Sequence, residues 1–330
     1  MASKSLERYH AVVNGRARAR YLVTKDKRVA ADISSSTRDL WGAHRDALSE
    51  GSRTGRVSLL DLKIELARRI HSPCTICERR CRAKRAEGEA GHCGVLDARV
   101  ASEFTHMGEE PDLVPSYTIF FAGCTFDCVY CQNWDISTRP RLGVVIAPEA
   151  LAQMIDRRCG PGGGARNVNW VGGDPSSNLL YILRTLNECR SNTPQVWNSN
   201  MYLTEESMAL LDGVVDVYLT DFKYGNDACA LRLSNAPGYM GVITRNHVLA
   251  RSQAEVMVRH LVLPGHLDCC TKPALSWIAS NLKDVKVNVM AQYRPEHKAM
   301  DHPELSRGLT VSEYEEAVKF AEELGLEPAD

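Results

Sequence analysis

The amino-acid sequence predicts an α/β protein: a partial (β/α)6 barrel preceded by a helical and cysteine-rich extension. After residue 116, short apolar runs alternate with stretches of helical periodicity, and strands separated by helices pair in parallel through right-handed crossovers. A doubly wound open sheet has the same alternation, so periodicity leaves both folds open. In either fold, functional residues collect at the carboxyl ends of the strands. The predicted strands are 117–123, 167–173, 195–200, 215–221, 256–265 and 285–291.

The connecting segments repeat their apolar residues every three or four positions, as amphipathic helices do. The predicted helices are 57–70, 148–159, 177–190, 204–213, 272–282 and 311–325. We expect three parts: a basic N-terminal arm at 1–57, a helix plus a four-cysteine metal-binding segment at 58–116, and the barrel at 117–330.

Composition and the N-terminus set the class of protein. Of the 330 residues, 44% are hydrophobic and 25% are charged, as in a soluble globular protein. No apolar run approaches the roughly 20 residues that cross a bilayer, so we expect no membrane partner. The first ten residues, MASKSLERYH, lack the apolar core of a signal peptide, and a cytoplasmic location is expected.

The charge is unevenly distributed along the chain. Residues 1–85 contain 20 of the 40 Lys and Arg residues but only nine of the 41 acidic ones. A basic region of this kind suits RNA or an acidic protein surface as substrate or partner, although a solvated helical face has the same composition.

Twelve cysteines are many for a cytoplasmic protein, where disulfides are rare and metal binding is the first explanation for close spacing. The first predicted strand leads into Cys124-x3-Cys128-x2-Cys131. Three thiolates at this spacing can hold three irons of a [4Fe–4S] cluster. No fourth cysteine follows nearby, so one iron is left open to a ligand. A cluster capped by a distant ligand, or three unrelated core cysteines, are the alternatives.

A second cluster of cysteines precedes the barrel. Four thiolates within twenty residues form a closed site for a second [4Fe–4S] cluster or for structural zinc, and the sequence does not decide between them. These residues are Cys74, Cys77, Cys81 and Cys93. Cys159, Cys189, Cys229, Cys269 and Cys270 follow no ligand spacing, and we expect them to behave as small buried hydrophobes.

The first cluster, Cys124-x3-Cys128-x2-Cys131, resembles the motif of the radical S-adenosylmethionine (SAM) superfamily, Cys-x3-Cys-x-aromatic-Cys, with Tyr130 at the aromatic position. The resemblance implies that the open iron binds SAM and that one electron cleaves it to a 5′-deoxyadenosyl radical, which abstracts hydrogen from a substrate. It also implies that Tyr130 packs along the adenine, although an aromatic residue there is more often part of the core.

Polar residues at four further strand ends fit the same resemblance. Gly172-Gly173-Asp174-Pro175 is similar to the Gly-Gly-Glu-Pro segment whose carbonyls receive the SAM ammonium. Asn198 and Asn200 share one face of a strand and suit SAM hydroxyls or carboxylate. Asp221 and Lys223 resemble the Asp-x-Lys pair of glycyl-radical activating enzymes. They are also the candidates for a catalytic role in this chain. Arg259 matches an arginine of the activating enzymes, and the resemblance implies that it pairs bidentately with the methionyl carboxylate; a salt bridge at the floor of the barrel is the alternative.

From about Leu59 to Gly325, the chain resembles a branch similar to pyruvate formate-lyase activating enzyme, made of activating-enzyme-like iron–sulfur proteins. This resemblance implies an oxidoreductase that modifies a glycyl-radical partner protein, with a flavodoxin or ferredoxin as reductant. Radical modification of RNA or a small metabolite is the alternative, and a non-catalytic iron–sulfur carrier is the second one. Glu109 and Glu110 are candidates for the mouth of the site.

Overall fold

The computed structural model describes residues 5–49 and 55–329. The predicted N-terminal arm at 1–57 is therefore described only in part. Residues 1–4, which belong to the segment expected to lack a signal peptide, lie outside the described residues.

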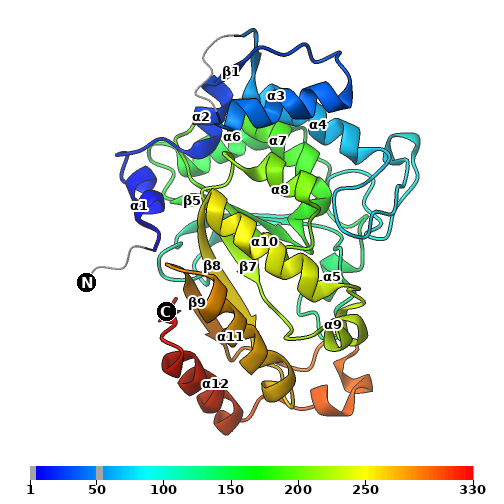
Figure 1. Ribbon diagram of the computed structural model, residues 1–330, viewed down its shortest axis with the longest axis vertical. Helices are drawn as coiled ribbons and strands as arrows, with labels where there is room; N and C mark the ends of the chain where they lie inside the picture. The colour runs from blue at the N-terminus through cyan, green and yellow to red at the C-terminus, as the bar shows by residue number, and fades with distance from the viewer. Residues whose placement is uncertain (1–4, 50–54, 330) are drawn as a thin grey trace.

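The centre of the protein is an eight-stranded sheet in the order β10-β9-β8-β7-β6-β5-β4-β3 (Figure 1). Every neighbouring pair from β4 to β10 is parallel, and β3 is antiparallel to β4. The strands are β3 (Val100–His106), β4 (Ser116–Phe121), β5 (Asn167–Gly172), β6 (Gln195–Ser199), β7 (Val217–Asp221), β8 (Glu255–Leu261), β9 (Lys286–Met290) and β10 (Glu327–Pro328). A separate antiparallel pair joins β1 (Arg28–Val29) to β2 (Val57–Ser58).

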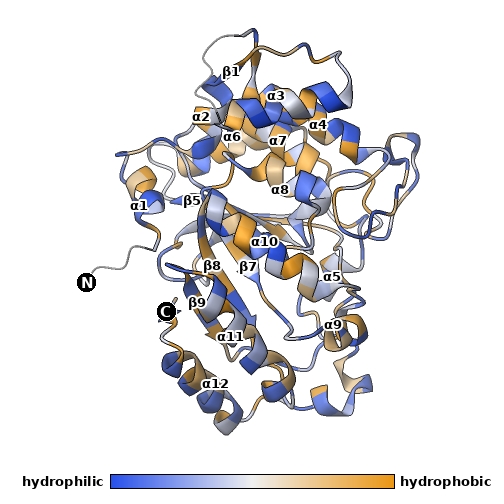
Figure 2. Cartoon of the chain, in the orientation of Figure 1, coloured by the Kyte–Doolittle hydropathy of each residue, from blue (hydrophilic) through white to orange (hydrophobic). Residues whose placement is uncertain are grey.

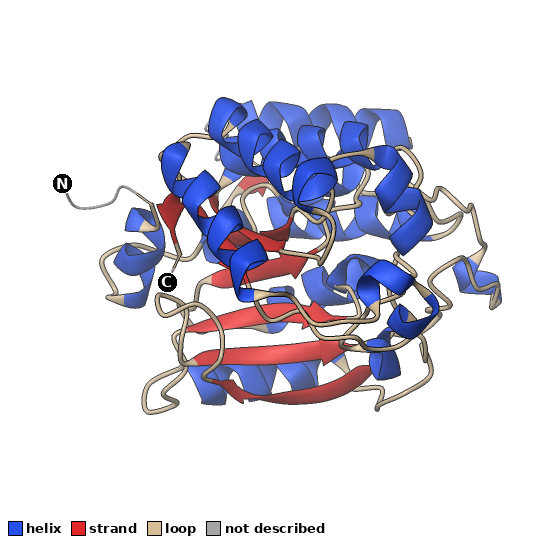
Figure 3. Cartoon of the chain, turned by 90° about the horizontal axis from the view of Figure 1, so that it is seen from below, coloured by secondary structure: helices blue, strands red, loops and turns tan. Residues whose placement is uncertain are grey.

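The strand order decides between the two folds that periodicity leaves open. A doubly wound sheet reverses its strand order at one point, whereas β4 to β9 follow one another in chain order. Right-handed crossovers that always advance in one direction put the connecting helices on one face of the sheet. Figure 3 shows the strands as one layer with helices stacked along it. The predicted partial barrel is confirmed.

The structure contains the six predicted helices and further ones. In the described residues the helices are α1 (Glu7–Val13), α2 (Arg20–Asp26), α3 (Thr37–Ser49), α4 (Leu59–His71), α5 (Trp134–Ser137), α6 (Pro148–Cys159), α7 (Leu179–Glu188), α8 (Glu205–Leu211), α9 (Asp227–Ser234), α10 (Tyr239–Gln253), α11 (Lys272–Asn281) and α12 (Val311–Glu323). The six predicted helices lie close to α4, α6, α7, α8, α11 and α12, and helix 148–159 is confirmed at both ends. Helices such as α3 and α10 carry both hydrophilic and hydrophobic residues (Figure 2), as expected of helices covered on one side.

Several elements were not predicted from the sequence, among them β3, α9 and α10. Half of β3 is solvent-accessible, so it contains no continuous apolar run. In α10 the buried positions include Asn246 and His247, which hide the apolar periodicity. The Asn246 amide donates to the carbonyls of Met201 and Leu203 at 2.7 and 2.8 Å, so the buried polar group is paired.

Carboxylates at the amino ends of the strands, one partly buried and one buried, accept hydrogen bonds from the N-terminal helices. Glu255, at the start of β8, accepts from the backbone N–H groups of Arg8 and Tyr9, both at 2.7 Å. Asp216, just before β7, accepts from the N–H of Arg20 at 3.1 Å. Carboxylates at helix N-termini are favourable because the free N–H groups and the helix dipole both attract negative charge.

Within the described part of the chain, no helix is both long enough and apolar enough to span a bilayer.

Candidate functional site

The carboxyl ends of six consecutive strands, β4 to β9, line one cavity of about 360 Å³. The sequence-predicted residues that it brings together are Cys124, Cys128, Tyr130, Cys131, Gly172, Gly173, Asp174, Asn198, Asn200, Asp221, Lys223 and Arg259. A parallel sheet places all its carboxyl ends at one edge, so residues up to 135 positions apart meet there.

The loop after β4 supplies the three thiols, and each lies near a polar hydrogen. The amide of Asn200 approaches the sulfur of Cys124 at 3.8 Å, and the Ser234 hydroxyl donates to Cys128 at 2.9 Å. The hydroxyl of Ser137 lies 3.4 Å from the sulfur of Cys131. Hydrogen bonds of this type stabilise thiolates at iron–sulfur sites.

The electrostatics of these thiols fit a bound metal cluster. Burial raises the pKa of the Cys128 thiol to about 12, because it outweighs the opposite effect of Lys223. Burial, Asp174 and the neighbouring thiol of Cys128 also raise the pKa of Cys124. Adjacent buried thiols with such pKa values ionise only when a cation compensates their charge, which is what a metal does for its thiolate ligands.

The turn after β5 needs glycine because a side chain there would collide with the neighbouring backbone. A Cβ on Gly172, which has φ of +142°, would lie 2.2 Å from the backbone nitrogen and oxygen of Phe121, and a Cβ on Gly173 would lie 2.1 Å from the carbonyl oxygen of Gly123. The glycines therefore allow close approach to the neighbouring strand β4 and its cysteine loop.

Asp174 is buried and its carboxylate is engaged within the protein. It accepts from the N–H of Ser176 at 2.9 Å, from the N–H of Asn200 at 3.0 Å and from the Ser199 hydroxyl at 3.1 Å. Burial raises the pKa of this carboxyl in spite of those bonds. Asp174 thus ties the end of β5 to the end of β6.

The two asparagines at the end of β6 have different surroundings. Asn200 is held by Thr125, whose hydroxyl accepts from the amide at 2.9 Å, and by the N–H of Tyr202. Asn198 also lines the cavity, and in the described residues its amide has no side-chain hydrogen bond. Of the two, Asn198 has the amide that is available to a ligand.

Asp221 and Lys223 form an ion pair of 2.9 Å at the end of β7. Burial by itself lowers the pKa of Lys223, but the charges of Asp221 and Cys128 outweigh it and the net shift is upward. The lysine is therefore a permanent cation beside the cysteine loop. The backbone N–H of Lys223 donates to the Tyr239 hydroxyl at 2.6 Å, which fixes the position of the chain here.

Arg259 lines the cavity, but its Nε and one Nη are already hydrogen-bonded within the protein. Its Nε and one Nη donate to the two oxygens of Glu110 at 2.7 and 2.6 Å, and Glu109 pairs with the same Nη. Glu110 is buried and also accepts from Asn288 at 2.9 Å. The predicted bidentate contact with a ligand would have to use the other Nη. Glu109 lines the cavity as expected, whereas Glu110 lies behind it.

Tyr130 is part of an aromatic cluster as well as of the cavity wall. Its hydroxyl lies 2.7 Å from that of Tyr224, and its ring packs edge-on against Tyr224 and Tyr293. Tyr224 in turn contacts Ser234, the residue that donates to Cys128. Sequence reasoning missed Tyr224 and Ser234, because Ser234 lies in a helix that the periodicity did not reveal.

The second cysteine cluster lies next to the first. Burial is the main cause of the raised pKa values of Cys74 and Cys77, and the neighbouring thiols of the same cluster add to the effect. Arg79, within this segment, donates to the carbonyl of Thr125 at 3.1 and 3.0 Å. A Cβ on Gly123 would lie 3.0 Å from the carbonyl oxygen of Cys93, so the two cysteine loops are in direct contact.

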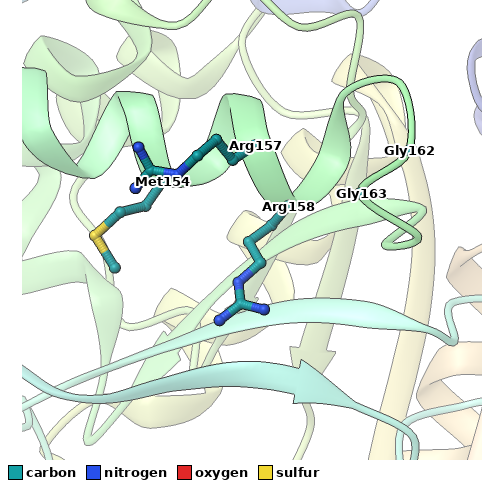
Figure 4. A pocket seen from close by; sticks show the side chains of 5 residues that line it. All are labelled: Met154, Arg157, Arg158, Gly162 and Gly163. Atoms are coloured by element: carbon teal, nitrogen blue, oxygen red, sulfur yellow. The ribbon is translucent and has the colours of Figure 1, made fainter.

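A hollow of similar size, about 370 Å³, lies away from these residues (Figure 4). It is lined by Met154, Arg157, Arg158, Gly162 and Gly163, at the carboxyl end of α6 and in the loop leading to β5. This is the amino end of the sheet, and no residue predicted from the sequence to bind a cofactor lines it.

Comparison with known proteins agrees with this geometry. A family model described as the radical SAM superfamily matches residues 118–278. An uncharacterized protein of Methanocaldococcus jannaschii, MJ0674, is 45% identical over 98% of each chain. Another from the same organism, MJ0808, is 25% identical over 73% of this chain and 78% of its own. SuiB of Streptococcus suis, solved with its precursor peptide SuiA, has a TM-score of 0.43 and 9% identity, over 61% of this chain and 43% of SuiB.

The family match defines the class of protein, and it extends from β4 into α11, the part of the chain that supplies the loop of Cys124 and most of the cavity. Residues 118–278 form a radical SAM superfamily domain.

Proposed function

We propose that the protein is an enzyme that reductively cleaves SAM and abstracts hydrogen from a substrate. The observation that supports it most is that the three thiols and the polar residues of four further strand ends line the same cavity. In the described residues that line it, no fourth cysteine completes a closed set. An electron carrier needs neither an open iron nor a polar pocket beside it.

Different residues of the cavity would bind the cluster and the separate parts of SAM. Cys124, Cys128 and Cys131 would hold three irons of a [4Fe–4S] cluster, which when reduced supplies the electron that splits SAM. Backbone carbonyls at Gly172 and Gly173 would receive the ammonium group of SAM, and Asn198 has a free amide for its polar groups. Lys223 would neutralise its carboxylate, with Arg259 as a second cation. Tyr130 would form the wall against the adenine.

The same proposal extends to the rest of the chain. Cys74, Cys77, Cys81 and Cys93 would hold a second [4Fe–4S] cluster, with zinc as the alternative, in a segment that contacts the first cysteine loop. The chain would consist of the N-terminal arm at 1–57, the metal-binding segment at 58–116 and the barrel at 117–330. A flavodoxin or ferredoxin would be the reductant. The substrate would be a glycyl-radical partner protein, as the resemblance implies.

The test uses full-length protein reconstituted anaerobically with iron and sulfide, then given SAM and dithionite. We expect wild type to release 5′-deoxyadenosine and Cys124→Ala to release none, because one iron loses its only protein ligand. Cys159→Ala, which changes a cysteine at the opposite end of the sheet, should keep the activity. No product from wild type with a verified cluster would contradict the proposal and favour the carrier.

A further inference from the structure

Three of the five cysteines without ligand spacing meet at one place. Cys229 lies in the first turn of α9, and Cys269 and Cys270 lie in a π-helical turn, Leu267–Thr271, that leads into α11. His266 directly precedes this turn. Both segments follow strands β7 and β8, in the lower half of Figure 1. The expectation that all five are simply buried hydrophobes is wrong for Cys269, which is exposed.

Four atoms that can bind a metal, one nitrogen and three sulfurs, lie close together. The Nδ1 of His266 lies 3.1 Å from the sulfur of Cys269, 3.8 Å from that of Cys229 and 3.9 Å from that of Cys270. The sulfur of Cys269 lies 3.9 Å from that of Cys229 and 3.8 Å from that of Cys270. All four atoms lie within 4.8 Å of one another.

Four of these separations, at 3.8–3.9 Å, lie close to the edges of a coordination tetrahedron, and the distance from His266 to Cys269, at 3.1 Å, is somewhat shorter. Bonds of about 2.3 Å to sulfur and 2.0–2.1 Å to nitrogen give edges of about 3.5–3.8 Å. A disulfide requires sulfur atoms about 2.05 Å apart, much closer than any pair here. In a four-iron cluster each thiolate binds a different iron, which spreads the sulfurs farther apart. The spacing therefore suits a single ion.

We propose that Cys229, His266, Cys269 and Cys270 form a tetrahedral site for one Zn²⁺ ion, which fastens the loop after β7 to the loop after β8. Three thiolates and one imidazole are a common ligand set for structural zinc, and soft sulfur ligands select it over magnesium or calcium. The site is separate from the two cysteine clusters, and it does not depend on SAM cleavage.

The surrounding residues orient and neutralise these ligands. The Asn226 amide points at the sulfurs of Cys229 and Cys270, at 3.4 and 3.9 Å. The Nε2 of His266 lies 3.9 Å from a carboxylate oxygen of Glu304, and a carboxylate on that side keeps Nδ1 free for a metal. Arg232, 3.4 Å from the same Nε2, offsets part of the thiolate charge.

The position of the site gives the ion a structural role. A Cβ on Gly225 would lie 2.8 Å from the carbonyl oxygens of Cys269 and Cys270, so the two loops already touch. At the far end of α9, Ser234 contacts Cys128 at 2.9 Å and accepts from the N–H of Asp127 at 3.1 Å. An ion at Cys229 would therefore steady the helix that supports the cysteine loop.

The test is the metal content of full-length protein expressed with zinc, determined by mass spectrometry. We expect about one zinc per chain in wild type, and its loss in both Cys229→Ser and Cys269→Ser with the iron content unchanged. Two controls should keep this zinc: Cys159→Ser, and the double variant Cys74→Ser/Cys77→Ser. The double variant excludes zinc bound at the other four-cysteine segment.

A second measurement replaces zinc by Co²⁺, whose tetrahedral thiolate complexes absorb visible light strongly. We expect this absorption in wild type and Cys159→Ser, and its loss in Cys269→Ser. Wild type without zinc, zinc that survives both single substitutions, or a native disulfide between Cys229 and Cys269 would each overturn the proposal. Because no SAM is present in these experiments, such a failure would leave the proposed SAM cleavage untouched.

Discussion

The two ends of the sheet differ in chemistry and in what their cysteines contact. At the carboxyl ends lie the cavity, the loop of Cys124, and the group around Cys269. At the amino ends lie the last turns of α6 and α7 with Cys159 and Cys189, and the carboxylates that hold the N-terminal helices. The same residue type thus lies in groups that could hold a metal at one end and as a packed side chain at the other. Position in the fold, more than residue type, separates the two roles.

The largest expected effect comes from changing two cysteines in the segment that contacts the loop of Cys124, compared with two cysteines at the amino end. Cys74→Ser/Cys77→Ser should remove about four irons per chain, because a closed cluster is lost when two of its ligands are removed. Its melting temperature should fall by about 10 °C or more, since the metal organises this short segment. Iron, sulfide and zinc analysis with a thermal melt measures both.

The matched control is Cys159→Ser/Cys189→Ser, which should keep all its iron. Loss of zinc instead of iron in the first variant would identify the segment as a zinc site. Equal iron loss in both variants would remove the distinction between the two ends.

An intermediate effect is expected at the Asp221–Lys223 pair. Lys223→Ala should lower kcat/KM for SAM cleavage about 10- to 100-fold, because the cavity loses a cation and leaves Asp221 unpaired. The melting temperature should change little, since the pair is partly exposed. Product formation across SAM concentrations measures the effect. Lys223→Arg should recover part of the activity, and an unchanged kcat/KM in the alanine variant would exclude Lys223 from the site.

The smallest effect lies at the amino end and depends on pH. Burial raises the pKa of Asp216 to about 6, from 3.8, so the folded protein binds this proton more tightly than the unfolded chain. That stabilisation is complete below pH 4 and is lost as the pH rises through 6. When the pH is lowered from 7.5 to 5.5, the free energy of unfolding of wild type should rise by about 1 kcal/mol relative to that of Asp216→Asn.

Urea denaturation of both proteins at the two pH values measures this difference. SAM cleavage by Asp216→Asn at pH 7.5 should equal that of wild type, since the residue lies at the opposite end from the cavity. A pH-independent difference in stability would show that Asp216 does not titrate in this range.

Much of the site could be predicted because its residues follow strands one by one. Cys124, Asn198 and Lys223 lie at the ends of predicted strands, and a parallel sheet brings such ends together. The engagement of Arg259 by Glu110 could not be predicted, because β8 and the segment before β4 are about 150 residues apart. The helix α9 was not predicted, and therefore Ser234, which donates to Cys128, was not predicted either.

The sequence by itself determined the alternation of strands and helices and the two cysteine motifs, because both depend on local spacing: apolar periodicity along an element, and thiols a few residues apart in one loop. Only the tertiary structure decided that the strands run in chain order without reversal, and that Cys229 meets Cys269 and Cys270. Those pairings form when β7 and β8 align side by side. The free energy that aligns them comes from the whole core, not from the residues that meet at its edge.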